Sequence, residues 1–106
     1  MNKLPDTTEL DFAAEVLQAP LPVLVDFHTP QCAPCRTMLP TLAELAQELE
    51  GRAKIVKVDA SEWPDLANEH KVMAVPTFLV FRAGAVVHRM VGAKSKRQLL
   101  DALGKL

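Results

Sequence analysis

Residues 23–27 form a short, valine-rich apolar run that only Asp26 interrupts, and the turn-forming residues Thr29 and Pro30 follow it. Continuous apolar runs of this length are typical of strands that are buried on both faces of a sheet. The segment therefore predicts a central strand. It also predicts that one carboxyl group lies in apolar surroundings, where a charge is costly unless it is paired or protonated.

Helical patterns alternate with apolar runs along the rest of the chain. We expect helices at residues 8–19, 34–49, 61–71 and from residue 95 onward, and further strands at residues 55–58, 77–81 and 86–91. Pro40 should kink the second helix, and Ala83-Gly84 should join the last two strands in a hairpin. Ser95 and Gln98 form a capping box for the last helix. The apolar face of that helix consists of Leu99, Leu103 and Leu106.

Strands that alternate with helices predict an α/β fold, in which a central sheet has helices on both faces. The closing hairpin adds an antiparallel part and makes the sheet mixed. Pro5 would restrict any first strand near Leu4 to an edge. The 106 residues contain no repeat or linker, so we expect one domain over residues 1–106.

Charge and hydropathy exclude two classes of partner. The 12 basic and 13 acidic residues nearly balance, whereas a nucleic-acid-binding domain of this size would show a basic excess. The longest apolar run, residues 21–25, is far too short to cross a bilayer. The first six residues lack the apolar segment of a secretion signal, so a complete chain of this sequence is expected in the cytoplasm.

The only cysteines, Cys32 and Cys35, lie between the end of the predicted strand and the start of the predicted helix. The dipole and free N–H groups of a helix start favour negative charge, and the thiolate is the nucleophile in disulfide exchange. Cys32 would lie at the exposed end of the helix and Cys35 one turn further in. We therefore expect Cys32 to attack a disulfide and Cys35 to resolve the mixed disulfide. Pro34 suits the first helical turn.

Three other uses of the two thiols were weighed. A zinc or iron–sulfur site usually needs four ligands, and the histidines are scattered, which disfavours a structural metal. Covalent haem attachment requires histidine directly after the second cysteine, where Arg36 stands. A pair of buried, chemically inert thiols remains open.

Asp26, Lys57 and Pro76 each allow a functional and a structural interpretation. Burial should raise the pKa of Asp26 toward the range useful for proton transfer with Cys35, but a strand-end aspartate bonded to a loop is the simpler alternative. Lys57 is expected to pair with Asp26 or to be solvated. Pro76 opens a strand, and most bonds that precede proline are trans.

Taken together, these residues resemble the thioredoxin family, for which a Cys-x-x-Cys beside a βαβ pattern is an established marker. The resemblance implies the thioredoxin fold, with Cys32 as nucleophile, Cys35 as resolving thiol, Asp26 as proton-transfer carboxylate and a cis Pro76. It also implies a substrate-binding surface made of Ala33, Pro34, Ala74, Val75, Pro76, Gly92 and Ala93. The matching segments are Val23-Leu24-Val25-Asp26-Phe27, Cys32-Ala33-Pro34-Cys35, Pro40, Val56-Lys57-Val58-Asp59, Val75-Pro76-Thr77-Phe78, Gly84 and Val91-Gly92-Ala93.

The sequence departs from the family pattern next to the cysteines. Gln31 and Ala33 replace the tryptophan and glycine of the usual Trp-Cys-Gly-Pro-Cys, and His28 stands where a second tryptophan is usual. A charged His28 near the thiols would stabilise a thiolate, whereas a neutral one would only fill space. We expect these residues to modulate the reduction potential and the range of partners.

The resemblance implies a protein-disulfide reductase that binds no cofactor or metal. Its electrons would come from NADPH through a flavoprotein reductase, and its partners would be disulfide-containing target proteins, with no nucleic acid or membrane. We expect a monomer. Two alternatives remain: an atypical member that serves one dedicated partner or reductase, and a binding or assembly module whose thiols are incidental.

Overall fold

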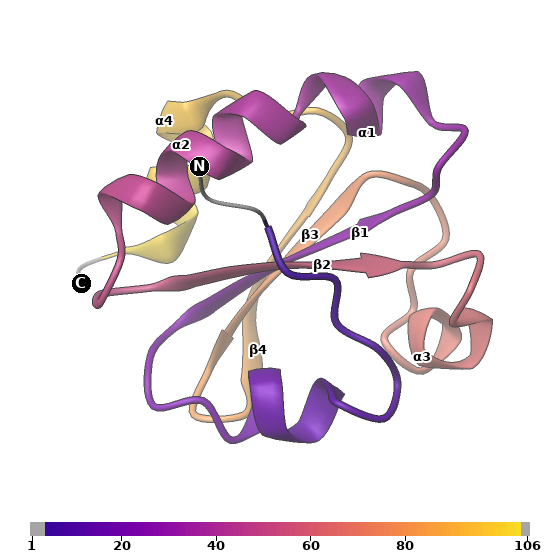
Figure 1. Cartoon of the computed structure of the whole chain (residues 1–106), viewed down its shortest axis with the longest axis horizontal. Helices are drawn as coiled ribbons and strands as arrows, with labels where there is room; N and C mark the ends of the chain where they lie inside the picture. Colours follow the sequence, from indigo (N-terminus) through magenta and orange to yellow (C-terminus); the bar gives the residue numbers. More distant parts are fainter. Residues whose placement is uncertain (1–3, 105–106) are drawn as a thin grey trace.

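The computed structural model describes residues 4–104, and these contain a mixed sheet of four strands (Figure 1). The strands β1 (Val23–His28), β2 (Lys54–Asp59), β3 (Thr77–Arg82) and β4 (Ala85–Val91) lie in the order β2-β1-β3-β4. β1 is parallel to β2 and antiparallel to β3, and β3 is antiparallel to β4. The inner position of β1 and the mixed character of the sheet confirm the prediction from the apolar runs.

Helices cover both faces of the sheet, as predicted (Figure 1). The helical segments are η1 (Ala13–Leu17), α1 (Ala33–Thr37), α2 (Leu39–Glu48), α3 (Pro64–Glu69) and α4 (Lys96–Leu103). One apolar core joins η1 and α3 to alternate residues of the strands, among them Val25 and Phe27. The other core joins α2 and α4 to the opposite face, which includes Leu24 and Phe78. Asp26 and His28 follow Leu24 at steps of two residues, so they face the side of the sheet that carries α2.

The helix predicted at residues 34–49 is divided into α1 and α2 at Met38 instead of being kinked. The ring of Pro40 offers no N–H for bonding and would clash with the preceding turn, so a continuous α-helix cannot form there. The division leaves α1 as a short helix that carries both cysteines. α1 follows the end of β1 and holds Cys35 in a buried position.

Two other predicted helices are shorter than expected, because side chains bond to the backbone ahead of them. Thr8 Oγ1 accepts the N–H of Asp11, which holds a separate turn before η1. Asp59 Oδ1 accepts the N–H of Ser61 and, at 3.3 Å, that of Glu62, so that α3 begins only at Pro64. The first strand near Leu4 is reduced to a single parallel bridge between Asp6 and Lys57.

The hairpin and the last helix follow the sequence prediction. Ala83 and Gly84 have φ angles of 51° and 81°, as a two-residue hairpin turn requires. A Cβ atom on Gly84 would lie 3.0 Å from the carbonyl oxygen of Leu17, so glycine also allows a close approach to η1. The capping box of Ser95 and Gln98 is present. Leu99 and Leu103 are buried, and Leu106 lies outside the described residues.

Candidate functional site

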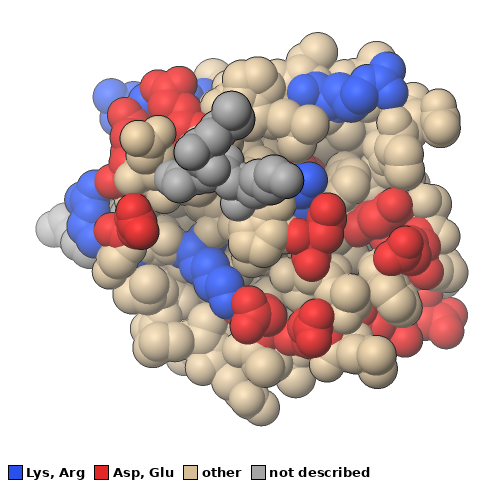
Figure 2. All heavy atoms as spheres, viewed as in Figure 1, with Lys and Arg blue, Asp and Glu red and all other residues tan. Residues whose placement is uncertain are grey.

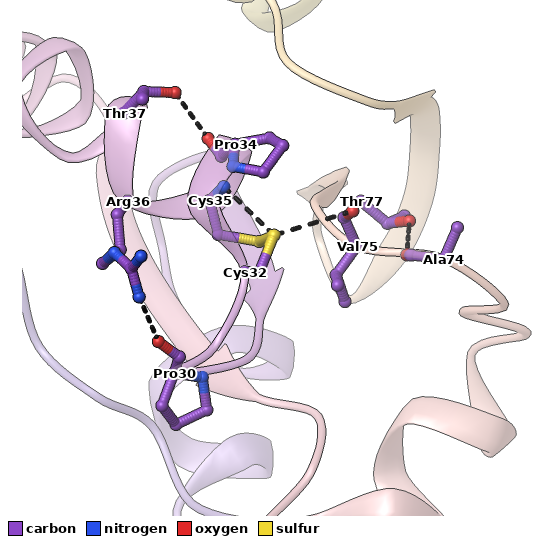
Figure 3. The surroundings of a disulfide bond; sticks show 9 residues. All are labelled: Pro30, Cys32, Pro34, Cys35, Arg36, Thr37, Ala74, Val75 and Thr77. Atoms are coloured by element: carbon purple, nitrogen blue, oxygen red, sulfur yellow. Dashed lines mark hydrogen bonds between the residues drawn. A yellow bond between two sulfur atoms is a disulfide. The ribbon is translucent and has the colours of Figure 1, made fainter.

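Cys32 and Cys35 form a disulfide at the junction between β1 and α1 (Figure 3). Cys32 is the N-cap of α1, and its Cα lies 5.2 Å from that of Cys35. The loop before the helix is held by Arg36, whose guanidinium donates a hydrogen bond of 2.8 Å to the carbonyl oxygen of Pro30. Strand, loop and helix thus present the cysteine pair just beyond the carboxyl end of the inner strand β1.

The two sulfur atoms differ in exposure and in bonding. The Cys35 side chain is buried, with 2% of the residue exposed, whereas Cys32 is partly exposed. The backbone N–H of Cys35 donates a hydrogen bond of 3.1 Å to Cys32 Sγ. A backbone N–H aimed at one sulfur stabilises negative charge on that sulfur once the disulfide is reduced. Cys32 therefore has the surroundings of a nucleophilic thiolate, and Cys35 those of a shielded thiol.

A second loop faces the disulfide from the start of β3. The Val75–Pro76 peptide bond is cis, as the family resemblance implies and contrary to the trans geometry that base frequencies favour. The carbonyl oxygen of Val75 lies 3.9 Å from Cys32 Sγ (Figure 3). Thr77 Oγ1 donates a hydrogen bond of 2.6 Å to the carbonyl oxygen of Ala74. These contacts hold the bent backbone of residues 74–76 beside the reactive sulfur.

The loop at Gly92 is bonded through its backbone to the loop that contains Pro76. Its N–H donates a hydrogen bond of 2.8 Å to the carbonyl oxygen of Pro76. Ala93 is exposed on the same loop, and Ala33 and Pro34 are exposed at the start of α1. The structure thus links Cys32, Val75, Pro76 and Gly92 through direct contacts.

A groove of about 250 Å³ runs between Val75 and α3. It adjoins the surface beside the disulfide through Thr29 and Val75. Met73 is 92% exposed at its rim, an unusual exposure for so large an apolar side chain. Most of its lining side chains are apolar: Ala60, Pro64, Ala67, Val72, Met73 and Ala74.

Asp26 is fully buried on β1, and its two carboxylate oxygens make no hydrogen bond to any described residue. Burial without compensating bonds raises the pKa of Asp26 from 3.8 to about 7. Lys57, which lies opposite it on β2, opposes this rise in pKa, and Asp6 adds to it. The carboxyl group therefore exchanges its proton near neutral pH.

Lys57 and His28 both contact Asp6, a residue that no sequence pattern singles out. Lys57 Nζ lies 3.6 Å from Asp6 Oδ2, and His28 Nε2 lies 3.5 Å from Asp6 Oδ1. Asp6 reaches them through its bridge to Lys57 at the outer edge of β2. No local pattern marks Asp6, because only long-range strand pairing brings it to the site.

Comparison with known proteins assigns the family. The family model described as Thioredoxin matches residues 3–105. The chain belongs to the thioredoxin family. Thioredoxin 1 from Nostoc sp. is 40% identical over 105 residues, which cover 99% of this chain and 98% of that protein. Thioredoxin from Synechocystis sp. is 38% identical with the same coverage.

One relative has a longer chain. The bifunctional thioredoxin reductase/thioredoxin of Mycobacterium leprae is 40% identical over 98 residues, which cover 92% of this chain and 21% of that protein. Together with the disulfide that Cys32 and Cys35 form, membership in the thioredoxin family shows that this chain is a thiol–disulfide oxidoreductase.

The positions at which this thioredoxin departs from the family pattern differ in exposure. Gln31 and Ala33 are exposed on either side of Cys32. The side chain of His28 is only 16% exposed and lies at the base of the cysteine loop. Gln31 and Ala33 therefore alter the exposed surface beside Cys32, whereas His28 alters the partly buried region below it.

Residues 4–104 contain neither a cluster of metal-ligating side chains nor a helix that could span a membrane. No three histidine, cysteine, aspartate or glutamate side chains gather there in a way that could hold a metal ion. None of the helices in that part of the chain is long and apolar enough to cross a membrane. On the face drawn in Figure 2, acidic side chains gather around the end where α3 lies and basic ones lie above α1.

Proposed function

We propose that this thioredoxin-family protein reduces disulfide bonds in other proteins, with Cys32 as the nucleophile and Cys35 as the resolving thiol. The observation that carries the proposal is the hydrogen bond from the Cys35 N–H to the partly exposed sulfur of Cys32, beside a buried Cys35 side chain. One thiol is thereby activated and accessible, while the other is held close and protected.

Reduction proceeds in two exchange steps. Cys32 thiolate attacks one sulfur of the target disulfide, forms the mixed disulfide and releases the first target thiolate, which takes a proton from water. Cys35 then loses its proton and attacks Cys32 Sγ. The Cys32–target bond breaks, the second target thiolate leaves and is protonated, and the Cys32–Cys35 disulfide remains. Two electrons pass from the protein to the target.

Asp26 is proposed to exchange a proton with Cys35 during the second step. Its pKa of about 7 leaves it poised between the two protonation states at neutral pH, as a general base requires. Lys57 modulates Asp26 by opposing the rise in its pKa. Asp26 and Lys57 are register partners on β1 and β2, and both strands end two residues further along the chain.

The target chain is proposed to bind across the surface of Ala33, Pro34, Ala74, Val75, Pro76, Gly92 and Ala93. The backbone carbonyl of Val75 lies beside Cys32, so a target strand bound along it would place its own cysteine against the nucleophile. The apolar groove that ends at Met73 would receive a neighbouring side chain of the target. Both features favour a polypeptide substrate over a small disulfide.

We further propose that the chain acts as a monomeric single domain over residues 1–106 in the cytoplasm, with no cofactor of its own. Its electrons would come from NADPH through a flavoprotein reductase of the thioredoxin-reductase kind. The fused relative from Mycobacterium leprae supports this, because it joins a thioredoxin reductase and a thioredoxin in one protein.

Reduction of insulin by dithiothreitol, with catalytic amounts of the protein, tests this function. The wild-type chain should accelerate precipitation of the insulin B chain, and Cys32→Ser should not. Equal rates for the two proteins would overturn the proposal.

The exposed Gln31 favours a second candidate, a thioredoxin that serves one dedicated partner or reductase. NADPH consumption with an established bacterial thioredoxin reductase separates the two. A general reductant is turned over by that enzyme. A thioredoxin that serves one dedicated partner is not turned over by that enzyme, and Gln31→Trp should then raise the rate of NADPH consumption.

A further inference from the structure

Three ionisable side chains stand in a row at the β2 edge of the sheet. Lys57 on β2 is the register partner of Asp26 on β1, and on its other side it forms the parallel bridge with Asp6, where the N-terminal segment runs along β2 (Figure 1). Side chains at paired positions of neighbouring strands, about 4.8 Å apart, point to the same face of the sheet. Lys57 therefore lies between two carboxyl groups that its ammonium group can approach.

The ammonium group of Lys57 contacts the outer of the two carboxyl groups. Lys57 Nζ lies 3.6 Å from Asp6 Oδ2, whereas the two carboxylate oxygens of Asp26 make no hydrogen bond to any described residue. The side chain of Asp6 is 65% exposed, whereas Asp26 is fully buried. Because a charge costs less near water than in the core, the ionised Asp6 is the more favourable partner for the ammonium group.

The backbone on both sides of Asp6 fixes its position relative to Lys57. The N–H of Thr7 donates a hydrogen bond of 2.7 Å to the carbonyl oxygen of Lys57, and the N–H of Lys57 donates one of 2.9 Å to the carbonyl oxygen of Pro5. His28 Nε2 also lies 3.5 Å from Asp6 Oδ1. Exposed ion pairs are weak partly because two mobile side chains must be ordered. The backbone bonds reduce that cost for Asp6 and Lys57.

We propose that Asp6 is a positioning residue, which draws the ammonium group of Lys57 outward and so leaves the Asp26 carboxyl group without a partner. This inference rests on the proposed exchange of a proton between Asp26 and Cys35. An Asp26 carboxylate that paired with Lys57 would be a weaker base toward the Cys35 thiol. Asp6 thereby keeps the buried carboxyl group able to take up and release a proton near neutral pH.

The charges that act on Asp26 agree with this arrangement. Burial raises the pKa of Asp26 most, Lys57 lowers it, and Asp6 raises it further. Loss of the Asp6 charge therefore lowers the pKa of Asp26 in two ways, since the direct repulsion disappears and the ammonium group of Lys57 is released. A cavity of about 170 Å³ beside Lys57 reaches Cys35. The titratable and charged groups around Asp26 and Lys57 are Asp6, His28, Cys35, Arg36 and Asp59.

An NMR titration of the Asp26 side-chain carboxyl carbon tests the proposal. It uses the oxidised protein, in which neither cysteine titrates, and Asp26→Asn identifies the resonance. Asp6→Asn removes the outer charge and keeps the size of the side chain. Glu15→Gln is the matched control, because Glu15 also pairs with a lysine of β2, with Lys54 Nζ 3.0 Å from Glu15 Oε1.

We expect the pKa of Asp26 to fall by about one unit or more in Asp6→Asn and to keep its wild-type value in Glu15→Gln. In the background of Lys57→Met or Lys57→Gln, Asp6→Asn should lower the pKa of Asp26 by less than about half as much, because only the direct repulsion is then lost. An unchanged pKa of Asp26 in Asp6→Asn would overturn the proposal. An equal fall with and without Lys57 would overturn it too, because Asp6 would then not act through the ammonium group.

The lifetime of the mixed disulfide tests the consequence for resolution. Reduced protein is mixed with insulin between about pH 5 and 8, quenched with acid and analysed by mass spectrometry. In Asp6→Asn the pH at which resolution accelerates should fall together with the pKa of Asp26, whereas Glu15→Gln should follow the wild type. A lowered pKa with an unmoved pH profile would support positioning by Asp6 and overturn the proposed proton exchange between Asp26 and Cys35.

Discussion

The backbone N–H of Cys35 points at the sulfur of Cys32, 3.1 Å away, while the side chain of Cys35 is withdrawn into the protein. The relationship follows from the position of Cys32 as N-cap of α1, which leaves the first N–H groups of the helix free for its side chain. It makes the two thiols chemically different although only two residues separate them.

This difference predicts selective alkylation of the reduced protein. Iodoacetamide at pH 7 should modify Cys32 at least about tenfold faster than Cys35, because a hydrogen bond to a charged group contributes about 1.5–3 kcal/mol and burial protects Cys35. Peptide mapping after short exposure measures both rates. Equal labelling of the two residues would contradict the assignment of their roles.

Asp26→Asn should stabilise the protein in a pH-dependent manner. Below about pH 4 Asp26 is protonated in both the folded and the unfolded state. As pH rises from about 4 through 7, Asp26 ionises in the unfolded chain before it ionises in the folded protein. The free energy of unfolding of the wild type therefore falls over this range. A shift in the pKa of Asp26 from 3.8 to about 7 corresponds to a loss of about 4 kcal/mol in the free energy of unfolding at high pH. The neutral amide of asparagine avoids this loss.

Urea denaturation at pH 4 and pH 8 measures this effect. The free energy of unfolding of Asp26→Asn should exceed that of wild type at pH 8 and approach it at pH 4. Asp65→Asn, which alters an exposed carboxylate on α3, serves as the control and should show little change. A gain that is as large at pH 4 as at pH 8 would show that burial of the Asp26 charge is not its cause.

The sequence predicts the sheet and its two faces well, because their determinants are local. The apolar run at residues 23–27 and the capping box at Ser95 each depend on neighbouring side chains. Pro40 predicts only a kink, whereas the helix is divided two residues earlier, at Met38.

The surroundings of the site were less predictable. The cysteine pair and Asp26 stand out from local context, but Asp6 becomes a partner of Lys57 and His28 only through a bridge between segments about 50 residues apart. Likewise, the cavity that joins His28 to Cys35 depends on how the cysteine loop folds over β1. Such contacts depend on tertiary packing, which residue spacing does not encode.

Arg36→Ala should slow insulin reduction by about threefold, because the loop before Cys32 loses the hydrogen bond from the guanidinium to Pro30. Arg52→Ala is a matched control, since Arg52 donates a similar bond to the carbonyl oxygen of Glu48 at the opposite end of α2. Initial rates of the dithiothreitol-driven assay compare the two. If both variants retained the wild-type rate, Arg36 would have no part in positioning the loop.

Ser95→Ala should lower the free energy of unfolding by about 1 kcal/mol without changing insulin reduction. Ser95 Oγ accepts the N–H of Gln98 at 3.1 Å, and the substitution removes this bond. The other bond of the capping box, from the N–H of Ser95 to Gln98 Oε1 at 2.9 Å, uses a backbone donor that alanine keeps. Thermal and urea unfolding measure the change. An unaltered midpoint would show that the start of α4 contributes nothing to stability.

The division of roles between the two cysteines is tested most directly by trapping the mixed disulfide. Cys35→Ser should form a stable covalent adduct with an insulin chain, and tryptic mass mapping should locate it at Cys32. Cys32→Ser should form no adduct at a comparable rate, because its remaining thiol is buried. An adduct that forms as fast on Cys35 in Cys32→Ser, or no adduct in Cys35→Ser, would contradict the mechanism.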